Sequence, residues 1–368
     1  MIVDAMKKLV NKLDDNIKGR SIGHPFFSHP AYKTFPLSQE NFKHVKPVER
    51  RRRYMFVDGG NQEILGAPNF SIQFNRIYFN SFESQHRVLG NSMPNRVEFL
   101  SATHSRFQEG EIFYDTSIFP LENHRDLLPD EADLSFNSFD RTVTIGTQRA
   151  DIQRVASIAR GFAEWDYAFH VVEKEMKEGN VLVMDGTLQT GFTNESKYAH
   201  KVYDAAKQKG VVVTGLSKTS HLFTTTGLSL LGAINKLAED CEIYESWYIP
   251  VAEVATTDHN AAIFVVKLHP LSKHTFRFEI LQDQFKQVGE EGMNEILSQL
   301  VENSKDVSFP GYPYGLVDAD RFARVSNNEV ESYRAILLSE ISKTGNWPKF
   351  LRHVSATDAH TILNMLMG

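Results

Sequence analysis

The chain is almost without cysteine, since Cys241 is the only one among its 368 residues. A single cysteine excludes an internal disulfide framework and any zinc site made from several cysteines of one chain, and it is typical of a reducing compartment. We expect Cys241 to be a small packed residue near a helix end. An apolar run of the ~20 residues that cross a bilayer is also absent, as is the apolar core of an N-terminal signal peptide. These absences predict a soluble, cytoplasmic protein with no membrane partner.

An excess of positive charge is missing as well. The chain has 40 Lys and Arg against 46 Asp and Glu, so its formal net charge is −6 and its surface as a whole repels nucleic acid. DNA binding would therefore need a local basic groove or bound divalent cations. The remaining composition, 41% hydrophobic and 23% charged, is that of a folded protein with one large core or two smaller ones.

The chain does contain an aspartate that follows an apolar segment at two places. Asp58 follows residues 54–57 (YMFV), Asp185 follows residues 181–184 (VLVM), and a glycine comes after each aspartate. We expect each aspartate at the C-terminal end of a strand, before a glycine turn that lets a cation or a phosphate approach the backbone. Taken singly, each is better explained as a turn residue that accepts a hydrogen bond from the next backbone N–H. Together, the two predict one shared cation site.

The hydrophobic pattern predicts an α/β protein, with a mixed sheet flanked by helices, in a single domain. An antiparallel meander comes first, then a long buried helix near residues 147–178, then strands that alternate with helices. We expect a core over residues 50–326 with an irregular acidic insertion near residues 103–145. An N-terminal helix and connector (residues 1–47) and C-terminal helices (residues 327–368) flank it. A meander whose first strand bears an aspartate, followed by a helix and a strand that ends in aspartate, is the outline of the ribonuclease-H-like fold.

Two-metal nucleases of this outline need further carboxylates, and Glu164 is the first candidate. It lies on the buried helix, 21 positions before Asp185, with Gly161 and Ala168 leaving space around it. A buried carboxylate needs a partner, and Arg160, one turn earlier, supplies the simpler structural explanation. Spacing alone slightly favours that ion pair over metal binding.

Residues 311–321 (GYPYGLVDADR) supply candidates near the C-terminus. A turn there presents Tyr312, and Asp320 follows about two helical turns later, where it can face the same end of the sheet. Helix-start acidity is the simpler explanation of the acidic residues here, and it fits Asp318 better than Asp320. Lys218, which follows a strand, is expected either to hold a phosphate or to be a solvated loop lysine.

In this order, the motifs resemble the NurA family of nucleases, which work with the hexameric ATPase HerA in processing DNA ends. The matching segments are residues 56–60 (FVDGG), 162–165 (FAEW), 183–188 (VMDGTL), 215–218 (GLSK) and 311–314 (GYPY). The resemblance implies a ribonuclease-H-like core, a homodimer and docking onto HerA. It also implies manganese-dependent DNA cleavage, with single-strand endonuclease and 5′-to-3′ exonuclease activity.

Carried over position by position, the resemblance implies that Asp58, Glu164 and Asp185 are metal ligands and that Tyr312 is the active-site tyrosine. The chain departs from the family pattern eight residues after that tyrosine, where Asp320 stands in place of histidine. Aspartate is also a hard oxygen ligand for Mn²⁺ or Mg²⁺. The change therefore leaves open retained metal binding, an altered metal preference or reduced activity.

The mechanism that we expect is two-metal phosphodiester hydrolysis with Mn²⁺ or Mg²⁺. Asp58 bridges the two cations, and Glu164 and Asp185 complete their coordination. Asp320 binds one cation or orients the attacking water.

Phosphates on either side of the scissile bond are expected to contact Lys218 and the arginine run at residues 51–53. For the arginine run, a solvated charged lead-in to a strand is at least as good an explanation.

Two other function classes stay open. Actin-like and sugar-kinase ATPases share the fold outline and bind phosphates at turns like residues 185–187 (DGT), but the chain has no Walker loop and no glycine-rich adenosine motif. The other class is a catalytically weakened adaptor that binds DNA ends or the ATPase. Convergence of the acids favours the nuclease, whereas a Glu164–Arg160 pair away from the aspartates favours the adaptor.

Overall fold

The computed structural model describes residues 1–49, 51–90, 92–345, 348–349 and 352–354. These residues form two compact units. The first contains Met1–Arg52, Val183–Gln189 and Val212–Tyr314, and the second contains the described residues of Arg53–Leu182, Thr190–Val211 and Gly315–Gly368. Each unit is therefore assembled from segments that are far apart in the chain. None of the helices among the described residues is long and apolar enough to cross a membrane.

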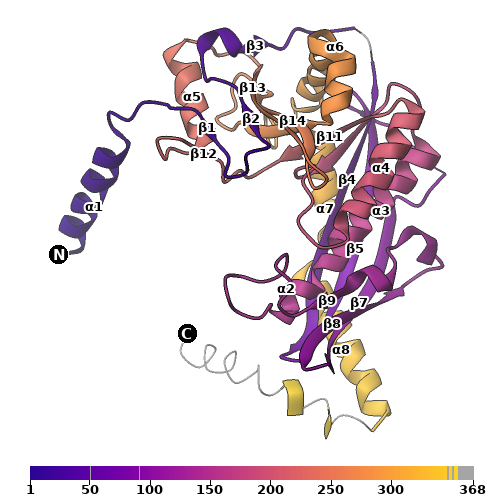
Figure 1. Ribbon diagram of the computed structural model, residues 1–368. Helices are drawn as coiled ribbons and strands as arrows, with labels where there is room; N and C mark the ends of the chain where they lie inside the picture. Colours follow the sequence, from indigo (N-terminus) through magenta and orange to yellow (C-terminus); the bar gives the residue numbers. More distant parts are fainter. Residues whose placement is uncertain (50, 91, 346–347, 350–351, 355–368) are drawn as a thin grey trace. The chain divides into compact units, whose positions relative to one another are not determined.

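Long antiparallel strands dominate the second unit (Figure 1). Their order is β4-β5-β7-β8-β9, with β6 beside β5. The bounds are β4 (Arg53–Ala67), β5 (Phe70–Glu83), β6 (His86–Arg87), β7 (Arg96–Gln108), β8 (Glu111–Pro120) and β9 (Ser135–Asn137). Glu109 and Gly110 join β7 to β8 with φ values of 53° and 87°, the backbone of a two-residue hairpin turn that matches strand twist. β5 is buried at almost every position, which means that both faces of these strands are covered.

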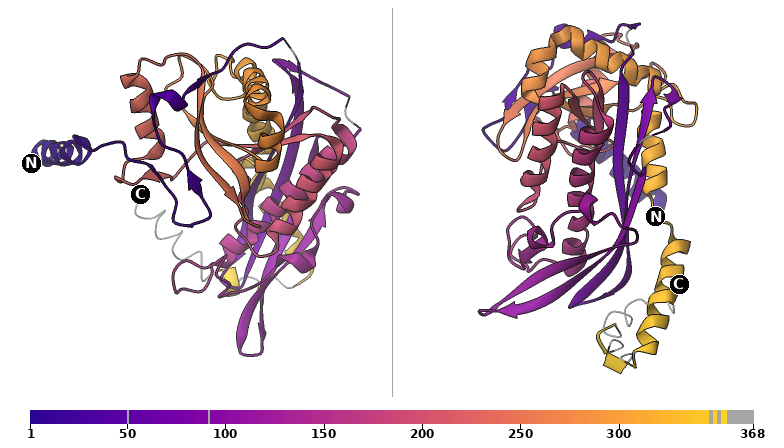
Figure 2. Two further views of the ribbon diagram at one scale, coloured as in Figure 1. Left: turned by 45° about the horizontal axis from the view of Figure 1, so that its top comes forward. Right: turned by 90° about the vertical axis from the view of Figure 1, so that its right-hand side faces the viewer.

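Helices cover the two faces. The bounds are α2 (Ile152–Ala156), α3 (Ile158–Glu175), α4 (Glu195–Lys209), α7 (Tyr314–Ala323) and α8 (Asn327–Lys343), with 3-10 turns η2 (Arg125–Leu127) and η3 (Glu131–Leu134). The right-hand view of Figure 2 shows α3 and α4 on one side of the long strands and α7 and α8 on the other. α3 buries Phe162, Tyr167 and Val171 along its length. β4 thus lies between two helical layers, and its successive side chains alternate between them.

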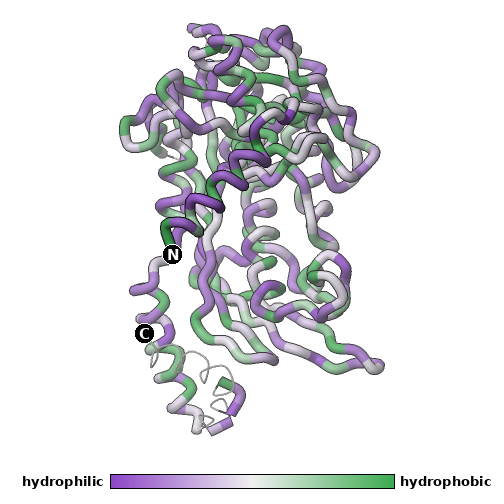
Figure 3. Tube along the Cα trace, turned by 90° about the vertical axis from the view of Figure 1, so that its left-hand side faces the viewer, coloured by the Kyte–Doolittle hydropathy of each residue, from purple (hydrophilic) through white to green (hydrophobic). Residues whose placement is uncertain are grey.

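The first unit has its own sheet and core. Its strand order is β2-β13-β14-β15-β11, β3 also pairs with β13, and β1 pairs separately with β12. The bounds are α1 (Ile2–Ile17), β1 (Pro25–Phe26), β2 (Lys33–Thr34), η1 (Gln39–Asn41), β3 (Lys43–His44), β11 (Val212–Ser217), β12 (Phe223–Thr224), α5 (Leu230–Asp240), β13 (Trp247–Ala255), β14 (Asn260–Lys267), β15 (Phe276–Ile280) and α6 (Gln282–Asn303). Ile234 of α5 and Trp247 of β13 belong to the same buried cluster. Figure 3 shows hydrophobic and hydrophilic residues alternating along α1, none of which is buried.

One strand, β10 (Val181–Asp185), has residues in both units, because the division falls between Leu182 and Val183. It neighbours β4 and β11, and α4 lies between β10 and β11 in the chain. The order β7-β5-β4-β10-β11 confirms the mixed α/β sheet of ribonuclease-H-like outline that the sequence predicts.

The expected strand end at Asp58 is wrong. β4 continues through Gly59 and Gly60 to Ala67, so Asp58 lies inside a strand and opposite Tyr78 of β5. The glycines that follow it do not form a turn. They allow close packing instead, of Glu164 against Gly59 and of Ala323 against Gly60.

Other boundaries also differ from the prediction. The segment at residues 103–145 is not irregular throughout, because residues 103–120 complete β7 and form β8. The long helix is divided at Ser157 into α2 and α3, and the strand β13 is absent from the prediction. Cys241 is indeed the residue that ends a helix, α5. α8 confirms the first C-terminal helix, whereas the helices expected over residues 355–368 lie outside the described residues.

Candidate metal centre

Asp58 projects from β4 toward α7. Phe56, Asp58 and Gly60 share one face of the strand. On that face, a Cβ at Gly315 of α7 would meet the Phe56 ring at 2.1 Å, and a Cβ at Gly60 would lie 2.4 Å from the carbonyl oxygen of Ala323. Asp58 is 9% exposed, and its Oδ1 accepts a hydrogen bond from the next backbone N–H at 2.7 Å. The local hydrogen bond of a turn aspartate is therefore present, although the backbone is extended.

Glu164 approaches β4 from the other face. Gly59 points toward α3, where an added Cβ would lie 2.4 Å from Glu164 Oε1. Arg160 Nη1 forms an ion pair with the same oxygen, as the spacing predicts, and lies 3.5 Å from the carbonyl oxygen of Gly59. Glycine at position 59 thus makes room for this carboxylate against the strand.

Asp318 and Asp320 lie on α7 in different surroundings. Asp318 is buried, pairs with Arg87, and accepts a hydrogen bond from Asn80 Nδ2 at 2.8 Å. Its explanation as helix-start acidity is therefore wrong, because it anchors α7 to β5 and β6. Asp320 is exposed instead.

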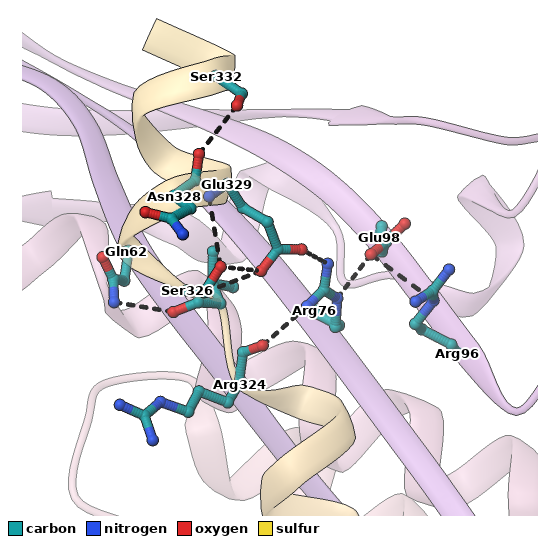
Figure 4. A network of polar contacts seen from close by, with 10 residues as sticks. Gln62, Arg76, Arg96, Glu98, Arg324, Ser326, Asn328, Glu329 and Ser332 are labelled. Carbon is teal, nitrogen blue, oxygen red and sulfur yellow. Dashed lines mark hydrogen bonds and ion pairs between the residues drawn. The ribbon is translucent and has the colours of Figure 1, made fainter.

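The junction between α7 and α8 is held by Arg76 of β5 (Figure 4). Its guanidinium donates to the carbonyl oxygen of Arg324 at 2.8 Å, to Glu329 Oε1 at 2.7 Å and to Glu98 Oε1 at 2.6 Å. Glu329 and Ser326 also form a capping box at the start of α8. The hydrogen bond from Arg76 is the main reason that the pKa of Glu329 is lowered to about 2. The end of the helix that carries Asp320 is therefore fixed to the strands.

A cavity of about 350 Å³ lies beside this junction in the second unit. Its lining residues are Asp58, Gly59, Gly60, Asn61, Gln62, Asp320, Arg324 and Val325. Arg324 is exposed, and no hydrogen bond or ion pair found among the described residues involves its guanidinium. Sequence analysis missed this residue, although its spacing of four from Asp320 places both on one helical face.

Asp185 lies at the end of β10 with a hydrogen-bond donor at each carboxylate oxygen. Lys218 Nζ is 2.7 Å from Oδ2, and the hydroxyl of Tyr312 donates to Oδ1 at 3.3 Å. Lys218 Nζ also lies 5.7 Å from the centre of the Tyr312 ring, within cation–π range. The first unit therefore brings together Asp185, Lys218 and Tyr312, three of the candidate site residues from the sequence.

Three aspartates have the geometry of a cation site. Asp58, Asp185 and Asp320 each offer one carboxylate oxygen, and these oxygens lie within 4.8 Å of one another. Oxygens on opposite sides of one divalent ion are separated by about twice the metal–oxygen distance, roughly 4–5 Å. Carboxylates are hard donors that suit Mg²⁺, Mn²⁺ or Ca²⁺. The cluster is thus able to bind a metal ion, and Glu164 is not one of its three members.

Two arginines of the run at residues 51–53 contact polar side chains of the protein. Arg52 Nη2 lies 2.6 Å from Glu295 Oε2, and Arg53 Nε donates to Ser81 Oγ at 2.7 Å. Arg51 is exposed. These contacts give Arg52 and Arg53 structural roles, so these two residues do not match a solvated lead-in, and only the exposed Arg51 fits that explanation.

A comparison with protein-family models matches residues 52–325 to the NurA domain. The chain belongs to the NurA family. The matched range nearly coincides with the core expected over residues 50–326, and it includes the strands and helices that carry all the candidate site residues. A comparison with curated proteins finds no match.

Several solved structures share a distant likeness with this NurA protein. Endonuclease V of Ciona intestinalis in complex with DNA is 8% identical, with 75% of this chain and 86% of that chain covered and a TM-score of 0.36. The catalytic domain of human endonuclease V is 11% identical, with 87% and 94% covered and a TM-score of 0.34. Argonaute of A. aeolicus is 10% identical, with 76% and 29% covered and a TM-score of 0.31. These values carry no inference about activity.

Proposed function

We propose that this NurA-family protein is a metal-dependent deoxyribonuclease. The observation that carries the proposal is the group of carboxylate oxygens from Asp58, Asp185 and Asp320 within 4.8 Å of one another. A pair of Mn²⁺ or Mg²⁺ ions, when bound, would supply an activated water molecule and neutralise the leaving oxygen of a phosphodiester. Membership of the NurA family supports DNA as the substrate.

The carboxylates differ in how firmly they are held. Asp58 lies inside a paired strand, so its backbone is fixed on both sides. Asp320 lies on a helix and is exposed, which suits a ligand that also orients water. Glu164 is the fourth carboxylate of the proposal, and it would exchange its ion pair with Arg160 for a cation. Tyr312 would orient Asp185 through its hydroxyl.

Two cationic side chains are suited to hold the DNA backbone. Lys218 is 39% exposed beside Asp185, and an ammonium acts as a point charge toward a phosphate. Arg324 lines the cavity that contains Asp58 and Asp320, and its guanidinium can bind a phosphate through two parallel hydrogen bonds. These local charges offset a chain whose net charge is −6.

We propose DNA ends as the substrate, with single-strand endonuclease and 5′-to-3′ exonuclease activity, in break repair or phage defence. A homodimer and a HerA-type hexameric ATPase complete the proposal, and both rest on family membership. Size-exclusion chromatography with light scattering, with and without the ATPase, tests them. A monomer that never co-elutes with the ATPase would contradict this part alone.

The experiment that tests the nuclease is cleavage of labelled single-stranded and duplex DNA with Mn²⁺, Mg²⁺ or EDTA, with and without the ATPase. Asp58→Asn keeps the shape of the side chain and removes its charge. Asp204→Asn, at an exposed aspartate of α4, is the matched control. We expect metal-dependent cleavage that Asp58→Asn abolishes and Asp204→Asn retains. No cleavage under any of these conditions would refute the proposal.

The ion pair between Arg160 and Glu164 favours a second candidate, a DNA-end or ATPase-binding adaptor with weakened catalysis. An adaptor would bind DNA ends or the ATPase in the experiment above without cutting. If Arg160→Met creates or strongly raises cleavage, the pair itself restrains the metal site.

A further inference from the structure

A series of buried polar side chains in the first unit ends on the loop that follows Asp185. Glu279 of β15 is fully buried, and its Oε2 accepts a hydrogen bond from the backbone N–H of Leu188 at 2.7 Å. The same oxygen lies 3.0 Å from His259 Nε2, and His259 Nδ1 lies 2.9 Å from the hydroxyl of Tyr32. Because a carboxylate only accepts, Nε2–H donates to Glu279. In the neutral imidazole, Nδ1 then accepts from the Tyr32 hydroxyl, so these partners select one tautomer of His259.

The charge of Glu279 is balanced by Arg277. Arg277 Nη2 lies 2.5 Å from Glu279 Oε1, a contact that is an ion pair without the angles of a hydrogen bond. Burial raises the pKa of the Glu279 carboxyl, but Arg277, His259 and the N–H of Leu188 together lower it below its usual value. Glu279 is thus an ionised acceptor, and its hydrogen bond to the Leu188 N–H is of the strong, charge-assisted kind.

Stability alone does not account for this network. A buried ion pair often contributes no more than apolar residues of similar volume, because its desolvation offsets its attraction. What an apolar replacement cannot do is accept the backbone N–H of Leu188, three residues after Asp185. The network therefore has a positional role.

The loop after Asp185 is held at two backbone amides. The N–H of Gly186 donates to the carbonyl oxygen of Leu216 at 3.0 Å, and the N–H of Leu188 donates to Glu279 at 2.7 Å. Gly186 has φ +131°, which favours glycine, and its carbonyl oxygen would lie 2.7 Å from a Cβ on Gly215. Asp185 thus lies between strand β10 and a loop whose backbone is fixed by these hydrogen bonds at Gly186 and Leu188.

We infer that Tyr32, His259 and Glu279 are positioning residues that set the carboxylate of Asp185 for metal binding. The inference rests on the proposed function, in which Asp185 is a ligand. It also gives a role to the N-terminal connector, because Tyr32 precedes the range that matches the NurA domain, residues 52–325. His259 is buried and links Tyr32 to Glu279 by contacting one with each ring nitrogen.

Two variants separate position from folding. Tyr32→Phe removes only the hydroxyl and keeps the ring stacked on Phe27 at 4.3 Å. The double variant Arg277→Met with Glu279→Leu removes both charges together and leaves neither one buried alone. Tyr248→Phe, at a tyrosine of β13 that is 5% exposed, is the control. The readouts are hydrogen exchange of the amides at residues 186–188 and the Mn²⁺ concentration for half-maximal DNA cleavage.

We expect faster exchange at residue 188 and a half-maximal Mn²⁺ concentration raised about tenfold or more in the double variant, as for outer partners of metal ligands. Tyr32→Phe should also speed exchange at residue 188 and raise the half-maximal Mn²⁺ concentration, but by less than the double variant. Tyr248→Phe should leave both quantities unchanged. Wild-type exchange and Mn²⁺ dependence in both folded variants would overturn the inference. If the wild type cleaves no DNA, the proposed function fails while the exchange experiment still decides whether the network holds the loop.

Discussion

The replacement Glu329→Gln tests how the junction after α7 is held. Glu329 Oε1 accepts a hydrogen bond from Arg76 at 2.7 Å, and Oε2 accepts one from the backbone N–H of Ser326 at 2.8 Å (Figure 4). With Arg76 as the largest cause, the pKa of Glu329 is lowered from 4.5 to about 2. Glutamine keeps the shape of the side chain but loses the charge that both contacts use.

The loss of unfolding free energy in Glu329→Gln can be worked out from the pKa shift of Glu329. The difference of 4.5 minus about 2 corresponds to about 3 kcal/mol of unfolding free energy. Because the side chain is 34% exposed, solvent screening reduces this to about 1–2 kcal/mol. The folded pKa lies below the unfolded one, so the stabilisation is complete above pH 4.5 and is lost as the pH falls toward 2. At pH 7 we therefore expect Glu329→Gln to be about 1–2 kcal/mol less stable than the wild type.

Urea unfolding followed by circular dichroism at pH 7, 4.5 and 3 measures this difference. The control is Glu331→Gln, on the same helix, where the ion pair with Arg334 involves a glutamate that is 68% exposed. The control should lie within about 0.5 kcal/mol of the wild type. The reasoning fails if both variants are equally stable at pH 7, or if the loss in Glu329→Gln stays constant down to pH 3.

Three further predictions concern the site itself. Gly60→Ala should lower the unfolding free energy by about 1–3 kcal/mol, because its Cβ would meet the backbone oxygen of Ala323 at 2.4 Å. Gly161→Ala, whose Cβ would have nothing within 4 Å, should stabilise α3 slightly. Equal thermal unfolding of the two variants would contradict this. Asp320→His should retain cleavage with Mn²⁺ but lose it with Mg²⁺, since imidazole suits transition metals, and equal Mg²⁺-dependent rates in variant and wild type would refute a ligand role. DNA binding is measured in the cleavage-deficient Asp58→Asn background at several salt concentrations. There, Arg324→Gln should make the negative slope of log binding constant against log salt shallower by about 0.9, and an unchanged slope would exclude a phosphate contact.

The elements of the core could be predicted because their hydrophobic patterns are local. Apolar runs and alternation mark β4, β5 and β10, and the buried pattern marks α3. The β7–β8 hairpin could not be predicted in the same way, since Glu109 adopts positive φ at a turn where asparagine or aspartate is the usual signal. The role of Asp318 was equally hidden, because its partner Arg87 lies more than 200 residues earlier in the chain.

The same aspartate–glycine pair occurs in two different backbones, which limits what local sequence says about the site. After Asp185 the glycine does end the strand, with φ +131° at Gly186. After Asp58 the strand continues, and glycine is needed because Glu164 approaches from a distant helix. Asp58 is consequently held by strand pairing on both sides of its residue, whereas Asp185 has a strand on one side only. The carboxylate at the strand end is the one that needs additional support, and that is where Glu279 accepts the N–H of Leu188.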